Sequence, residues 1–147
     1  MNIDVKDSGS TIEALVKRLE RLEEACSDLS EVWPKVGAVF AQAQREVFAG
    51  GNTWAPLAAS TVLRKKSTRV LVETGVLEQG ATNPTPITSD NLSATFGVPP
   101  GHASREYAFW HYLGRGVPER DPVPNLSPTK REAIFRAAIE PIQEVLR

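Results

Sequence analysis

The chain has few of the residues on which reactive or metal-binding centres depend. Cys26 is its single cysteine, so an internal disulfide framework is excluded and synthesis in a reducing, cytoplasmic compartment is expected. The two histidines, His102 and His111, stand apart, and no CxxC motif or Cys/His cluster has the spacing of zinc ligands. We therefore expect neither a metal nor any other cofactor.

Net charge and long hydrophobic runs are lacking as well. Seventeen Lys and Arg residues stand against eighteen Asp and Glu residues, which leaves a formal net charge of -1. The chain therefore lacks the overall positive charge of a dedicated nucleic-acid-binding protein, although a local basic patch is compatible with this balance. Residues 1–10 are polar, and no apolar run approaches the about 18 residues of a membrane span. We expect neither a signal peptide nor membrane association.

The residues that are present have the composition of an ordinary globular domain. The chain has 147 residues, of which 41% are hydrophobic and 24% charged. This length is close to the commonest domain size, so we predict a single domain over residues 1–147.

Residues 10–49 are predicted to be helical, after a flexible N-terminus at residues 1–9. Apolar side chains recur there at spacings of three and four residues in two runs, with charged residues between them, which is typical of amphipathic helices. Ser10 and Glu13 have the spacing of a capping box. The glycine pair at residues 50–51 predicts the end of the second helix.

Pro34 determines how the two helical runs are joined. Inside a helix it would remove one hydrogen bond and cost ~3 kcal/mol or more, whereas in the first turn its missing N–H has no cost. We therefore predict a break near residues 28–30, with Ser30 capping the second helix. A single kinked helix is the alternative.

Residues 52–114 are predicted to contain a short helix and a small antiparallel β-meander, which makes the fold class α+β. The short helix is expected at residues 54–66. The segments with strand-like composition, separated by turns rich in Pro, Asn and Asp, are residues 70–77, 87–89 and 92–98.

The rear of the chain is predicted to be an extended segment followed by a helix. Residues 115–127 are interrupted by several prolines, which excludes a regular helix or central strand, and we interpret them as an extended arm. A final helix is expected over residues 128–147, with Ser127 as its cap and Pro128 at its first position.

No reaction centre is evident. A catalytic His111 would require a nucleophile and an orienting carboxylate, and no motif such as GxSxG frames any candidate. We interpret His111 as a buried or interface histidine instead, and we expect no enzymatic activity and no small-molecule substrate. A cluster of basic residues is compatible either with phosphate contacts or with a solvated helix end: Arg64, Lys65, Lys66 and Arg69.

Three short motifs follow the helical front part in a fixed order. They are W-x-P-L-x-x-x-T (Trp54, Pro56, Leu57, Thr61), L-x-x-T-G-x-L (Leu71, Thr74, Gly75, Leu77) and Y-A-x-x-H-x-x-G (Tyr107, Ala108, His111, Gly114). Together with the basic cluster, the proline and arginine arm and the final helix, this order resembles the tail-completion or virion-morphogenesis proteins of tailed bacteriophages. The resemblance extends from about Phe48 to Leu146.

The resemblance implies a non-enzymatic structural protein of the phage neck, made in the host cytoplasm and located in the virion. Such a protein acts as a ring of copies that completes the tail and joins it to the head connector. Its partners would be further copies of itself, connector or stopper proteins, and tail-terminator or tail-tube proteins. The motif residues would define the fold: Trp54, Pro56, Leu57, Thr74, Gly75, Leu77, Tyr107, Ala108, His111 and Gly114.

Two further expectations concern the ring. Basic residues facing a central channel would contact packaged DNA without sequence preference, and the candidates are Arg64, Lys65, Lys66 and Arg69. The arm would lie across a neighbouring copy and become ordered on assembly, through Arg115, Pro118, Arg120, Pro122 and Pro124. Two alternatives remain, namely a small regulatory or toxin–antitoxin-like binding module that forms a dimer or heterodimer, and a small hydrolase that uses His111.

Overall fold

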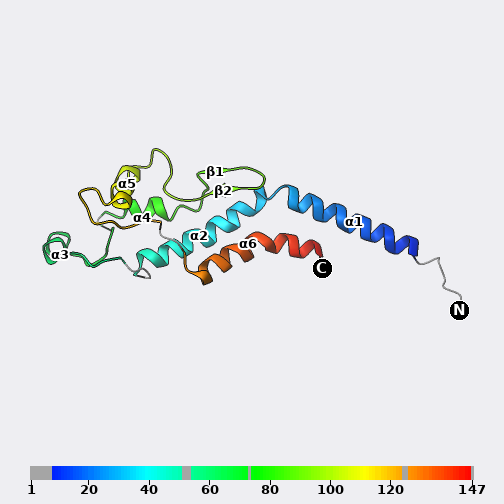
Figure 1. Ribbon diagram of the computed structural model, residues 1–147, viewed down its shortest axis with the longest axis horizontal. Coiled ribbons are helices and arrows are strands. Elements are labelled where there is room, and N and C mark those ends of the chain that lie inside the picture. Colours follow the sequence, from blue (N-terminus) through cyan, green and yellow to red (C-terminus); the bar gives the residue numbers. More distant parts are fainter. Residues whose placement is uncertain (1–7, 51–53, 73, 124–125, 147) are drawn as a thin grey trace.

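A long helix extends from one end of an elongated body (Figure 1). The computed structural model describes residues 8–50, 54–72, 74–123 and 126–146. These residues form six α-helices and one small two-stranded antiparallel sheet, with about 59% of the chain helical. The predicted α+β class is therefore confirmed.

The predicted break between the first two helices is confirmed. Helix α1 (Ser8–Ser27) ends before a short 3-10 turn, η2 (Ser30–Val32), and helix α2 (Trp33–Phe48) begins directly after it. Pro34 lies in the first turn of α2, where its missing N–H has no cost.

The prediction that Ser30 caps α2 is wrong. The N-cap is Val32, and no side chain bonds to the end of the helix. Instead, the Ser30 backbone N–H donates to Asp28 Oδ1 at 2.8 Å, so that Asp28 closes the turn between the helices. The predicted capping box lies outside the described residues, because the side chain of Ser10 is not among them.

The predicted C-terminal helix is confirmed as α6 (Pro128–Leu146). Its first turn is stabilised by Ser127, whose Oγ accepts a hydrogen bond from the Lys130 backbone N–H at 3.4 Å. The backbone of Ser127 also accepts a bond from the Arg131 N–H at 2.9 Å.

Helix α6 runs antiparallel to α2. Near one end of the pair, Lys35 on α2 lies 3.7 Å from the Glu140 carboxylate on α6. Near the other end, Lys130 Nζ donates to the Ala43 carbonyl at 3.1 Å and lies 3.2 Å from Glu46. The two helices lie side by side in the lower layer of the body (Figure 1).

The sheet is a short hairpin of β1 (Thr88–Ser89) and β2 (Ala94–Thr95). Asp90 organises its tip, because one carboxylate oxygen accepts backbone hydrogen bonds from Leu92 at 2.8 Å and Ser93 at 2.7 Å. These bonds, together with a bond from the Ser93 hydroxyl, lower the pKa of Asp90 below its usual value.

The hairpin tip is hydrogen-bonded to the junction between α1 and α2. The Trp33 indole Nε1 donates to the Asp90 carbonyl at 2.7 Å, and the Leu29 backbone N–H donates to the Asn91 carbonyl at 2.7 Å. The direction of α1 relative to the body therefore depends on contacts with residues far along the chain.

The predicted strand at residues 70–77 is wrong. Residues 70–71 form a turn, residue 72 has no regular structure and residues 74–75 form a bend, and helix α4 (Val76–Ala81) follows. Residue 73 of the predicted strand lies outside the described residues. Gly75 precedes this helix with a left-handed φ of 81°, and Leu77 and Ala81, four residues apart, are buried on one helix face. The meander is thus reduced to a hairpin.

Two other elements differ from the prediction. The helix predicted at residues 54–66 is restricted to α3 (Ala59–Lys65), and residues 54–58 have no regular structure. The aromatic run, for which no element was predicted, is helix α5 (Arg105–Leu113), which ends at Gly114 with φ 63°.

The hydrophobic core joins the end of α2 to α4. Its buried members are Phe48, Val72, Leu77 and Ala81. Partly buried side chains that pack against it are Trp54, Leu71, Val98, Ala108 and Val123. Since α5 and the segment after it contribute to this core, the rear half of the chain is folded against the front half.

Candidate functional site

The three sequence motifs meet around one cavity of about 780 Å³. We call it the motif cavity. It lies among α3, α4, α5 and the segment that follows α5. The motif residues that line it are Leu57, Thr61, Leu71, Thr74, Gly75, Leu77, Tyr107 and His111. The structure therefore brings together residues whose relation could not be inferred from their spacing.

Other motif residues hold the surrounding elements without lining the cavity. Trp54 packs edge-on against Phe48, with ring centroids 5.3 Å apart, and its indole Nε1 donates to the Asp121 carbonyl at 3.1 Å. Ala108 packs against the core, and Gly114 ends α5. Pro56 is exposed, so its role as a fold-defining residue has no visible contact to support it.

Arg120 is the most unusual side chain in the wall of the motif cavity. It is only 7% exposed, and its Nη2 donates to the Ala55 carbonyl at 3.2 Å. Its Nε atom is buried without a hydrogen-bond partner. Within the described part of the chain, no carboxylate forms an ion pair with this guanidinium.

His111 is held at the wall of the cavity by the segment that follows α5. Its Nδ1 lies 3.4 Å from the Pro118 carbonyl, and its backbone carbonyl accepts the Arg120 N–H at 2.9 Å. Burial lowers the pKa of His111, and the positive charges of Arg120 and Lys65 lower it further. No carboxylate is among the partners that the described hydrogen bonds give the His111 ring.

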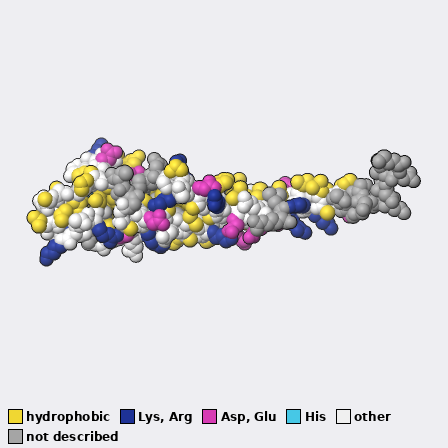
Figure 2. Space-filling model, turned by 90° about the horizontal axis from the view of Figure 1, so that it is seen from below, with side chains coloured by type: hydrophobic (Ala, Val, Ile, Leu, Met, Phe, Trp, Pro, Cys, Tyr) yellow, Lys and Arg dark blue, Asp and Glu magenta, His cyan; other side chains and the backbone are white. Residues whose placement is uncertain are grey.

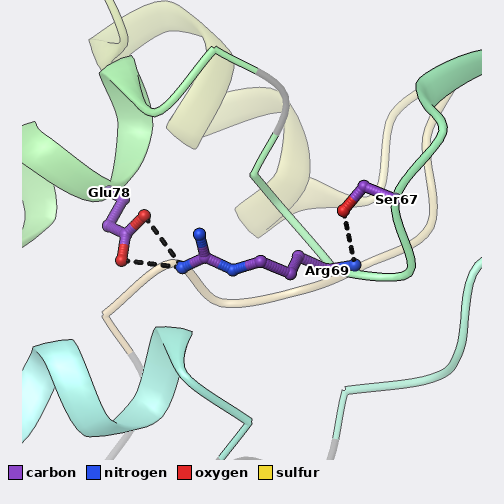
Figure 3. A network of polar contacts seen from close by, with 3 residues as sticks. All are labelled: Ser67, Arg69 and Glu78. Carbon is purple, nitrogen blue, oxygen red and sulfur yellow. Dashed lines mark hydrogen bonds and ion pairs between the residues drawn. The ribbon is translucent and has the colours of Figure 1, made fainter.

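The basic cluster is not a single patch. Arg69 turns toward α4, where its Nη2 lies 2.9 and 3.1 Å from the two carboxylate oxygens of Glu78, and its backbone N–H donates to Ser67 Oγ (Figure 3). Lys65 Nζ donates to the Arg69 carbonyl at 3.1 Å. Arg64 and Lys66 are exposed on α3 and directly after it.

On the face shown in Figure 2, basic and acidic side chains are interspersed and form no continuous positive surface. A continuous positive surface is what non-specific DNA contact requires. This face therefore gives the predicted DNA contact no support; Arg64, Lys66 and Arg69 are exposed, and Arg69 is paired with Glu78.

Residues 120–123 of the predicted arm are folded against their own chain. Arg120 and Pro122 are buried, so the prediction that these two residues lie across a neighbouring copy is wrong. The cause is the contact network with Trp54 and Ala55, which a pattern of prolines does not reveal. Of the other predicted arm residues, Arg115 and Pro118 are exposed, and Pro124 lies outside the described residues.

Two apolar surfaces are exposed on different elements. The first, which we call the α1 stripe, consists of side chains that are 46% to 58% exposed: Ile12, Leu15, Val16 and Leu19. The second, the α5 aromatic surface, consists of side chains that are 39% to 58% exposed: Phe109, Trp110, Tyr112 and Leu113. Tyr107, which is also exposed, lines the motif cavity instead. The helices that carry them, α1 and α5, lie toward opposite ends of the long axis, with α3 beyond α5 (Figure 1).

Membrane and metal sites find no support among the described residues. No described helix has both the length and the hydropathy that a transmembrane span requires. No three His, Cys, Asp or Glu side chains in the described ranges lie close enough to hold a metal ion.

Comparison with known proteins yields no relative: no protein-family model, no curated protein and no solved structure matches this chain. The motif cavity and the two apolar surfaces are therefore the observations from which function is argued.

Proposed function

We propose that the protein is a structural component of the neck of a tailed bacteriophage, where a ring of copies completes the tail and joins it to the head connector. The resemblance of the three ordered motifs supports the choice of family. The observation that carries the proposal is the presence of two different exposed apolar surfaces, the α1 stripe and the α5 aromatic surface, on helices that lie toward opposite ends of the molecule.

A closed ring needs two different surfaces on each copy. In a head-to-tail contact, one surface of each subunit binds the other surface of the next, whereas a symmetric dimer needs one self-complementary surface. We propose that the α1 stripe of one copy packs on the α5 aromatic surface of its neighbour. A helix of 20 residues spans ~30 Å, so α1 is long enough to reach beyond its own body.

The α1 stripe supplies a moderate binding energy. Its side chains are about half exposed, so each would contribute ~1 kcal/mol if the remaining surface were buried, or ~4 kcal/mol for the stripe. This is at the low end of the ~4–15 kcal/mol that association costs in lost translational and rotational freedom. The stripe alone therefore gives a weak contact, and a complete ring requires the aromatic surface and ring closure as well.

The first test is the mass of the purified protein over a range of concentrations, followed by electron microscopy with negative stain. We expect rings, or a monomer that forms rings when connectors or tail tubes are added. The variant Leu15→Gln/Leu19→Gln should lose rings. Lys17→Gln/Arg21→Gln, on the polar side of the same helix, should keep them.

A mixing experiment establishes the direction of the contact. Phe109→Gln/Tyr112→Gln damages the aromatic surface and leaves the α1 stripe intact. Neither this variant nor the stripe variant should associate alone, but a mixture at high concentration, ~1 mM, should give a weak one-to-one complex, because each supplies the surface that the other lacks. If the mixture shows no association even at ~1 mM, where a single contact without ring closure is expected to be populated, the head-to-tail contact is wrong.

One alternative is favoured by a specific observation. The α1 stripe can pair with the same stripe of a second copy, as in a two-helix coiled coil, which would produce the dimer of a small regulatory or binding module. In that case Phe109→Gln/Tyr112→Gln would dimerise by itself, and connectors and tail tubes would have no effect.

A further inference from the structure

The buried guanidinium of Arg120 lacks the partners that buried cations normally have. A positive charge removed from water is costly unless an anion or several acceptors surround it. The only hydrogen-bond acceptor that the described structure shows for this side chain is the Ala55 carbonyl, which Nη2 contacts at 3.2 Å. Nε is buried without any partner. Nε itself is almost inaccessible, so we infer that the rest of the guanidinium, at the wall of the motif cavity, accepts an anion from outside the chain.

The rest of the cavity wall fits such an anion. None of the described residues that line the motif cavity is acidic. Lys65 also lines it, and its ammonium group has three donors, of which one bond goes to the Arg69 carbonyl. Both side chains therefore supply positive charge to the same space.

Most of the remaining wall is apolar. The contributing side chains come from residues before α3, in and before α4, and after α5: Leu57, Leu71, Val76, Leu77, Val117 and Pro118. The volume of about 780 Å³ lies within the range of ~300–1,000 Å³ that is typical of sites for small organic molecules. An ion alone would leave most of this apolar wall uncovered.

We propose that the motif cavity binds a carboxylate attached to an apolar chain or ring, with the carboxylate at Arg120 and Lys65. A guanidinium binds the two oxygens of a carboxylate through parallel N–H donors, which makes this pair strong and directional. The apolar part lies against Leu77 and the side chains around it. The proposal concerns a site separate from the two assembly surfaces, and it does not depend on the ring.

A ligand that combines a carboxylate with an apolar group can come from two sources. One is a free small acid, and the other is the terminal carboxylate of a peptide segment of a partner protein that ends in an apolar residue. Both place one negative charge beside one hydrophobic group, so both satisfy the same wall. The experiment therefore uses a probe of each kind.

The first probe is 4-phenylbutyrate, with the uncharged 4-phenylbutyramide as its matched control. Amide chemical shifts of the 15N-labelled full chain should change saturably around the cavity, at residues such as Thr61, Thr74 and Val117. The uncharged amide should bind at least about tenfold more weakly, since it loses the charge-assisted bond. Lys65→Gln should weaken binding of the acid several-fold, whereas Lys66→Gln, at an exposed neighbouring position, should leave it unchanged.

The second probe is a short peptide with a C-terminal leucine, compared with the same peptide carrying a C-terminal amide. Tighter binding of the free-acid peptide than of phenylbutyrate would identify a partner protein as the source, and the reverse order would identify a small acid. Equal binding of each acid and its amide, no saturation by either acid up to about 10 mM, or shifts confined to other parts of the chain would overturn the proposal. Lys65 is the residue varied because Arg120→Met could fail to fold through loss of the bond to Ala55.

Discussion

Replacing Gly37 by alanine should destabilise the protein, although alanine is the better helix former. Gly37 lies inside α2, at the point where the chain before the hairpin crosses the helix. A Cβ atom placed there would overlap the carbonyl oxygen of Pro84 and lie 2.9 Å from Cε1 of the Phe96 ring. The nearest obstacle is backbone, which cannot move aside as the end of a flexible side chain can.

The two opposing effects can be compared in size. Glycine inside a helix costs ~1 kcal/mol relative to alanine, so the substitution Gly37→Ala recovers about that amount. Overpacking of a filled interior typically costs ~1–3 kcal/mol, and contact with backbone lies toward the upper end. We expect a net loss of ~2 kcal/mol, which for a chain of this length lowers the melting temperature by about 4–8 °C.

Urea unfolding, followed by circular dichroism, measures this difference directly. Ala38→Gly is the matched control, because Ala38 is exposed on the neighbouring position of the same helix and reports helix propensity alone, with an expected loss of ~1 kcal/mol. If Gly37→Ala instead stabilises the protein by a similar amount, the chain near Pro84 does not press on α2, and the packing argument is wrong.

Three further predictions test the core, the cavity wall and its histidine. Gln44 is fully buried, and neither of its side-chain polar atoms has a hydrogen-bond partner, so Gln44→Met should raise the free energy of unfolding by ~1–2 kcal/mol in the same urea assay. A loss would show that the amide has a partner. Trp54→Phe removes the bond to the Asp121 carbonyl and should cost ~1 kcal/mol, with little change in the ring packing on Phe48. Burial lowers the pKa of His111 from its usual 6.5, so the unfolded chain binds more protons below that value and stability should fall as the pH is lowered from 6.5. The variant His111→Gln should reduce this slope, and NMR titration of the ring should show a pKa below 6.5.

The long helices were predictable because their signals are local. In α1, α2 and α6 the apolar residues repeat at helical spacing over several turns, and Pro34 indicates the break. The hairpin was predictable for a similar reason, since turn residues at 89–91 separate two β-leaning segments. Such patterns depend on residues within a few positions of one another.

The errors arose where distant contacts decide the structure. The apolar run at residues 70–77 is short enough to suit either a strand or a buried helix, and the left-handed backbone at Gly75 decides in favour of α4. The burial of Arg120 depends on a bond to Ala55, 65 positions earlier in the chain. Neither periodicity nor composition contains information about that contact. The motif cavity was missed for the same reason, since its wall comes from three separate segments.

Half of α1 is exposed to solvent, and this exposure links the folding of α1 to the proposed assembly. From Ile12 to Arg21 its side chains are exposed, and only later residues such as Leu22 and Ala25 are partly covered. A helical segment of about this length is marginal in water without tertiary contacts. Its order therefore depends on propagation from the covered half, and binding to a neighbour must also supply the free energy of ordering. Since the α1 stripe contributes only ~4 kcal/mol, a single contact is weak. When a ring closes, its last contact forms within one assembly and is therefore favoured by a high effective concentration. We thus expect a protein that is monomeric when dilute and that assembles once a partner holds several copies together.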